Sequence, residues 1–181
     1  MKRVVSTFGL SEDGFRAGVV TFSHGADISI KFNNHYDSDS FNRAVDDIPL
    51  VGSITRIDLA LQKTEELFTK ENGARVYAAE FVVLITDGSQ TAFPGAADPC
   101  ALTDQMRREG KTVIVMGVGP ESDEKALECM AGGPEHSHKA KSFDELLKGS
   151  YVNEVKNELD ICENTLLWRI QNYFKPKSAA T

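Results

Sequence analysis

The side chains best placed for chemistry are a hydroxyl and a carboxylate, those of Thr55 and Asp87. Asp87 directly follows Glu80-Phe-Val-Val-Leu-Ile-Thr86, an apolar run that predicts a buried parallel strand. Thr55 closes the loop Gly52-Ser-Ile-Thr55, ahead of a predicted helix. Ligands of open α/β sheets bind beyond the carboxyl ends of the strands. Because hydroxyl and carboxylate oxygens suit Mg²⁺ or Mn²⁺, these two residues are candidate metal ligands.

Each of the two residues also has a simpler local explanation. Thr55 and Asp58 have the spacing of a capping box at the start of a helix. Asp87-Gly88 is a common turn after any strand. Taken singly, these local roles are the more frequent outcome, so the case for a site depends on the two loops occurring together.

The elements that must position these residues alternate between strands and helices. The predicted strands are an antiparallel edge hairpin at 16–22 and 27–32, buried parallel strands at 80–86 and 111–118, and a polar edge strand at 136–141. The predicted helices are 3–8, 37–48, 56–72, 100–109, 122–131 and 142–160. Alternation from residue 50 onward predicts βαβ units on a mostly parallel sheet.

Three segments in this order resemble the von Willebrand factor A domain family. They are Gly-Ser-Ile-Thr-Arg-Ile-Asp-Leu-Ala-Leu, then Val-Val-Leu-Ile-Thr-Asp-Gly, then Val-Ile-Val-Met-Gly-Val-Gly. The resemblance implies a Rossmann-like α/β fold, with an open, mostly parallel sheet, one antiparallel edge strand and helices on both faces. It also implies that Thr55 and Asp87 match two ligands of the family's metal-ion-dependent adhesion site (MIDAS), which holds Mg²⁺ or Mn²⁺.

The chain departs from the family pattern at one point. The Asp-x-Ser-x-Ser loop, which supplies most metal ligands in the family, is absent, and so is the first central strand. Three explanations fit this departure: a truncated sequence, a strand donated by another chain, and a degenerate scaffold. With two ligands left, we expect weak or absent metal binding. The strand at 16–22 must pair directly with 80–86, borrow a strand, or self-associate through exposed edges.

The resemblance also implies what the domain does. It predicts a protein-binding adhesion module at residues 1–160, followed by a helical tail at 161–181. The partner would be collagen or another matrix protein that contributes an acidic residue, in an extracellular location. The alternative is a metal-independent intracellular scaffold, favoured by the lack of a signal-peptide core in residues 1–8. Tail residues Thr165–Phe174 are expected to pack as a helix on their own domain.

Composition and the remaining motifs exclude several classes of protein. The 181-residue chain has a net charge of −7, which argues against general binding to nucleic acids or anionic membranes, and it has no run long enough for a membrane span. Gly117-Val-Gly119-Pro-Glu-Ser122 lacks the third glycine of a dinucleotide fingerprint. With no nucleophile–base pair either, we expect no enzymatic activity.

The three cysteines, Cys100, Cys129 and Cys162, match no zinc spacing. Free thiols are the favoured interpretation, ahead of a disulfide between Cys100 and Cys129.

Overall fold

The computed structural model describes residues 2–49, 52, 54–87, 89–146, 151 and 153–157. Its strands are β1 Val19–Phe22, β2 Ala26–Ile30, β3 Phe81–Thr86, β4 Thr112–Val118 and β5 Ser137–Ala140. Its helices are α1 Lys2–Phe8, α2 Ser38–Asp46, α3 Ile57–Leu67, α4 Pro99–Arg108, α5 Glu124–Ala131 and α6 Phe143–Leu146, with 3₁₀ turns η1 Lys70–Asn72 and η2 Pro134–His136. The predicted alternation of strands and helices is confirmed.

Aspartates start three of the helices. The carboxylate of Asp37 accepts a hydrogen bond from the Ser40 N–H at 2.8 Å at the start of α2. Asp98 and Asp123 cap α4 and α5 in the same way, each at 3.0 Å. Each cap satisfies a backbone donor that the first turn of a helix leaves unpaired, so the polar segments before these helices fix where they begin.

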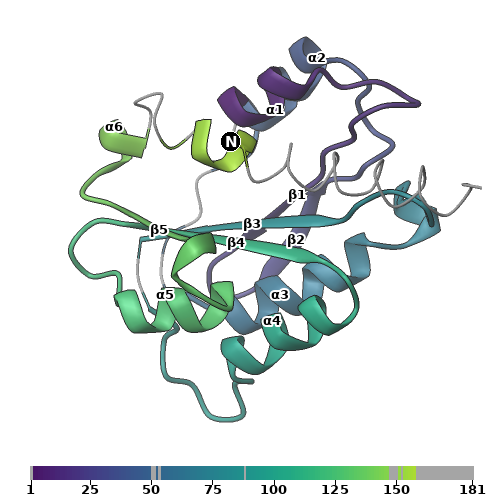
Figure 1. Cartoon of the computed structure of the whole chain (residues 1–181). Helices are drawn as coiled ribbons and strands as arrows, with labels where there is room; N and C mark the ends of the chain where they lie inside the picture. Colours follow the sequence, from purple (N-terminus) through teal and green to yellow (C-terminus); the bar gives the residue numbers. More distant parts are fainter. Residues whose placement is uncertain are drawn as a thin grey trace, which may run out of the picture.

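The three strands β3, β4 and β5 form a parallel sheet with β4 at its centre. The register runs from Phe81 opposite Thr112 to Thr86 opposite Gly117. Helices α3, α4 and α5 lie on one face of the strands, and α1, α2 and α6 lie on the other (Figure 1). This α/β arrangement, with helices on both faces, is the predicted fold class.

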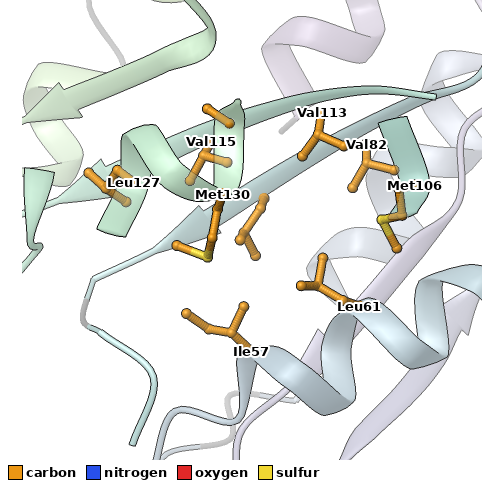
Figure 2. Packing of buried hydrophobic residues seen from close by; sticks show 10 residues of the cluster. Ile57, Leu61, Val82, Met106, Val113, Val115, Leu127 and Met130 are labelled. Atoms are coloured by element: carbon orange, nitrogen blue, oxygen red, sulfur yellow. The ribbon is translucent and has the colours of Figure 1, made fainter. Parts of the chain in front are cut away.

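One apolar core lies between the parallel sheet and the helices α3, α4 and α5. Leu61 of α3, Met106 of α4 and Leu127 of α5 meet strand residues there (Figure 2). The members of this core are Ile57, Leu61, Val82, Leu84, Met106, Val113, Val115, Leu127, Met130 and Ala131, all 7% exposed or less. The apolar face of α3, with Ile57 and Leu61, packs in this core and so fixes the position of the Thr55 loop that precedes the helix.

Strand β3 is less buried than its sequence predicts. Along β4 every residue after Thr112 is buried, as expected for the central strand of a parallel sheet. Along β3, buried Val82 and Leu84 alternate with the partly exposed Val83 and Ile85. Val83 and Ile85 share one face of the strand, so β3 is fully covered on one face and only partly covered on the other.

The hairpin of β1 and β2 forms a separate two-stranded sheet. The predicted antiparallel pairing is confirmed, with Val20 opposite Ile28 and Phe22 opposite Ala26. Direct pairing between the strand at 16–22 and the strand at 80–86, one of the outcomes considered above, is wrong. Among the described residues, β1 pairs only with β2, and β3 pairs only with β4.

A disulfide joins Cys100 of α4 to Cys129 of α5, with their Cα atoms 5.6 Å apart. The expectation of free thiols at these two positions is therefore wrong. The pair is distant in sequence, and only the packing of α4 beside α5 brings the two sulfurs together. Cys162 lies outside the described residues.

The C-terminal part of the prediction is only partly described. The predicted helix at 142–160 begins with α6, where the Ser142 hydroxyl accepts from the Glu145 N–H at 3.3 Å. Residues 151 and 153–157 are helical, and Val155 is fully buried against β4. The predicted tail helix at 165–174 and the domain boundary at 160 lie outside the described residues. Within the described part of the chain, no helix has both the length and the apolar character to cross a membrane.

Candidate functional site

The structure brings together the two loops that carry Thr55 and Asp87. The Thr55 N–H donates to the Thr91 hydroxyl at 2.9 Å, and the Thr91 N–H donates to the Thr55 carbonyl at 2.8 Å. Thr91 belongs to the loop that follows Asp87 after the end of β3. The loop before α3 therefore meets the loop after β3, and Asp87 lies at the carboxyl end of β3 as expected.

The two candidate ligands differ in exposure. Asp87 is exposed, immediately beyond the last residue of β3, whereas Thr55 is partly buried just before α3. The predicted capping box between Thr55 and Asp58 is wrong, because α3 begins without a side-chain cap. Thr55 is held by Thr91, and the Asp58 carboxylate has other partners.

A buried ion pair lies directly beneath the Thr55 loop. Arg56 donates from Nε and Nη2 to the two carboxylate oxygens of Asp58, both at 2.8 Å. Asp58 is 1% exposed and Arg56 is 9% exposed. A bidentate pair of this kind fixes both the position and the orientation of the two side chains.

The same carboxylate also binds the loop after β3. Gln90 Nε2 donates to Asp58 Oδ1 at 2.8 Å, and the Ala97 N–H donates to Oδ2 at 3.3 Å. The side-chain oxygen of Gln90 in turn accepts from the Asp58 N–H at 3.2 Å. The bonds from Arg56, with further help from Gln90 and backbone N–H groups, hold the pKa of Asp58 well below its usual range. Asp58 therefore ties residues 55–58 to residues 90–97.

Sequence reasoning missed this network. Arg56-Ile57-Asp58 suggested only a helix start, and its other two partners are far along the chain. No local spacing predicts that Gln90 and Ala97 bond to Asp58. A buried acid that accepts four hydrogen bonds becomes visible only once the two loops are folded against each other.

An exposed aromatic ring lies beside this network. The Phe93 ring is 51% exposed, and the guanidinium carbon of Arg56 lies 4.7 Å from its centroid. Pro94 and Gly95, which follow in the loop, are exposed as well. The rim of the sheet thus combines an exposed carboxylate with an apolar ring, which is a chemistry suited to contact with another macromolecule.

The donors present do not by themselves make a metal centre. Mg²⁺ takes near-octahedral coordination by oxygen atoms, and Thr55 and Asp87 supply one side chain each. Within the described ranges, no group of three or more histidines, cysteines, aspartates or glutamates is close enough to hold a metal ion. The residues therefore do not fit a complete MIDAS centre.

The broken glycine motif after β4 also has a structural role. The Ser122 hydroxyl donates to the Gly119 carbonyl at 2.8 Å and closes the turn between β4 and α5. Gly119 has φ of +88°, a conformation that glycine adopts without strain.

The comparisons with known proteins agree with this geometry. The profile of the von Willebrand factor type A domain matches residues 1–151. The chain belongs to this family. Two mouse proteins of collagen VI are similar to parts of it. The alpha-6(VI) chain is 30% identical over 144 residues, which is 80% of this chain and 6% of the relative. The alpha-4(VI) chain is 35% identical over 120 residues, which is 65% of this chain and 5% of the relative.

A solved structure has the same fold as this von Willebrand factor A domain. It is proximal thread matrix protein 1 from the mussel byssus, described with a zinc-occupied MIDAS motif. The likeness has a TM-score of 0.75 at 26% identity and covers 86% of this chain and 38% of that chain. The chain therefore spans only a small part of its collagen VI relatives and well under half of the mussel protein.

Proposed function

We propose that this von Willebrand factor A domain is a protein-binding module of the extracellular matrix. The partner, a collagen or another matrix protein, docks on the rim face, which we define as Thr55, Asp87 and Phe93 with the loops that carry them. The observation that carries the proposal is the exposed Asp87 and the half-exposed Phe93 on the loop after β3, which Asp58 ties to the Thr55 loop.

Two further observations support an extracellular matrix protein. The relatives are collagen VI chains and a byssal matrix protein. The Cys100–Cys129 disulfide supports an oxidising compartment, because disulfides are rare in the reducing cytosol. Both observations count against the metal-independent intracellular scaffold.

We further propose that this chain alone binds Mg²⁺ or Mn²⁺ weakly, and that the rim face binds its partner mainly through direct contacts. The basis is the incomplete oxygen ligand set of Thr55 and Asp87. A carboxylate such as Asp87 favours a basic group on the partner when no metal intervenes. Phe93, already stacked on Arg56, offers an apolar anchor at low conformational cost. We also propose that the domain catalyses no reaction.

Surface plasmon resonance on immobilised fibrillar collagen tests the proposed partner. Asp87→Ala and Phe93→Ala should each weaken binding by about tenfold, as expected for truncated anchor residues. Asp39→Ala removes an exposed carboxylate on α2, on the opposite side of the sheet from α3, and should bind as the parent does. Absence of binding by the parent, or equal loss in all three variants, would refute docking of collagen on the rim face.

A second experiment measures binding of the parent chain to the same collagen in the presence of Mg²⁺ and in the presence of EDTA. We expect a change of less than about threefold, since the described donors are too few to hold the ion. A loss of about tenfold in EDTA, abolished by Thr55→Ala, would contradict metal-independent docking while leaving the partner itself established.

A further inference from the structure

The Cys100–Cys129 disulfide lies close to the end of the loop that carries Phe93. This loop, residues 89–98 between β3 and α4, is called the rim loop below. Cys100 is the second residue of α4, so it follows the rim loop almost directly. The bond joins it to Cys129 in α5, a helix on the same face of the sheet (Figure 1). A covalent bond thus anchors the helix turn that the rim loop enters.

The two ends of the rim loop are held in different ways. At the start, Gln90 Nε2 donates to Asp58 at 2.8 Å, and Thr91 exchanges hydrogen bonds of 2.8 and 2.9 Å with the loop before α3. At the end, the Ala97 N–H reaches Asp58 at the longer distance of 3.3 Å. Residues 92–95, between these contacts, are exposed. The end of the rim loop therefore depends on the position of α4 more than its start does.

Contacts at both ends of α4 hold it against α5. Near its C-terminal end, Arg107 donates from Nη1 to the Met130 carbonyl. At its N-terminal end the disulfide makes the connection, because the capping residue Asp98 is exposed and belongs to the rim loop itself. Met106, which is 1% exposed, keeps the middle of α4 packed in the core. Breaking the disulfide would therefore release the first turn of α4 while the rest of the helix stays in place.

The two sulfur-bearing residues differ in their access to solvent. Cys129 is exposed on α5, whereas Cys100 is partly buried and packs against the core of Figure 2. Thiol–disulfide exchange requires that an attacking thiolate reach one of the two sulfurs. Because Cys129 is exposed in the folded domain, attack on its sulfur needs no prior unfolding.

We propose that Cys100–Cys129 is a redox-sensitive clamp on the rim loop, opened by a dithiol reductant while the domain stays folded. One thiolate of the reductant attacks Cys129 Sγ and forms a mixed disulfide, and Cys100 leaves as a thiolate that takes up a proton from water. The second thiolate of the reductant attacks its own sulfur in the mixed disulfide, and Cys129 leaves and is protonated in the same way. The reductant gives up two electrons and becomes a disulfide, and both cysteines end as thiols.

The consequence for the partner rests on the proposed function. The rim loop carries Phe93, and a contact residue on a loosened loop binds more weakly because its ordering opposes association. Opening of the clamp should therefore weaken docking on the rim face.

Hydrogen exchange read by mass spectrometry tests the clamp on the full chain, with dithiothreitol as the dithiol. Under native conditions, dithiothreitol followed by iodoacetamide should label both Cys100 and Cys129. The N–H groups of Ala96 and Ala97, bonded at 3.0 and 3.3 Å, should then exchange at least about tenfold faster. Those of α3 should change by less than about twofold, because α3 stays packed in the core. No labelling, an unchanged rim loop, or equal acceleration in α3 would overturn the proposal.

Variants and binding separate the clamp from its consequence. The double variant Cys100→Ser with Cys129→Ser should exchange as the reduced parent does, whereas the control Cys162→Ser should respond to dithiothreitol as the parent does. A folded double variant that exchanges like the oxidised parent would overturn the clamp. In surface plasmon resonance on fibrillar collagen, reduction should weaken binding by about tenfold. A faster rim loop with unchanged collagen binding would support the clamp and refute docking through Phe93.

Discussion

Removal of the Asp58 carboxylate should destabilise the domain more than removal of any exposed charged side chain. Asp58 is 1% exposed and accepts from Arg56, Gln90 and the Ala97 N–H. In Asp58→Ala, the buried Arg56 guanidinium loses its counter-charge, and breaking a buried pair costs about 3–5 kcal/mol. Stacking of Arg56 on Phe93 remains, so we expect about 3 kcal/mol, at the lower end of this range.

Thermal and urea unfolding measure this loss. For a chain of this length, about 3 kcal/mol corresponds to a fall in melting temperature of roughly 6–12 °C. Asp104→Ala is the matched control, because Asp104 pairs with Arg107 and Arg108 at an exposed site and should change the melting temperature little. A loss of stability in Asp58→Ala no larger than in the control would refute the structural role assigned to this ion pair.

The remaining predictions concern the pH dependence, the disulfide, the core and the metal. The folded state lowers the pKa of Asp58, so the contribution of its carboxylate to stability is present above about pH 4 and is lost as the pH falls further. The Asp58→Ala variant should therefore lose less stability on acidification than the parent. Reduction of Cys100–Cys129, which closes a loop with a sequence separation of 29, should lower the free energy of unfolding by about 3–4 kcal/mol in denaturant titrations with and without reductant. Leu61→Ala, at a site that is 1% exposed, should cost about 3 kcal/mol in the same titration. Calorimetric titration with Mg²⁺ should give at most weak heats, and micromolar binding abolished by Asp87→Ala would show ligands beyond Thr55 and Asp87.

The parts of the fold that depend on local pattern could be predicted from the sequence. Apolar runs at 80–86 and 111–118 became β3 and β4, and Asp37 became the cap of α2. The rim position of Asp87 followed from the end of the strand at 80–86, whereas Thr55 became a candidate through its loop and the resemblance to the family.

Features that depend on distant partners could not be predicted. The Asp58 network joins residues that are 32 and 39 positions apart, and the disulfide needs α4 and α5 side by side. The partly exposed face of β3 is a further case: its composition is that of a fully buried strand, but its burial depends on how completely distant segments cover that face. In all three, the feature is set by contacts between segments that are far apart in the sequence.

The Cys100–Cys129 bond has a mechanical consequence. It encloses α4, β4 and most of α5 in one covalent loop, and β4 is the middle strand of the parallel sheet. When the two ends of the chain are pulled apart, the force passes through the sulfurs and bypasses the enclosed segment. About 100 Å of contour length is thereby withheld from extension. In a domain that bears tension within a matrix, the segments outside this loop would thus unfold first. The enclosed strand β4 would not be extended and could refold as soon as the tension fell.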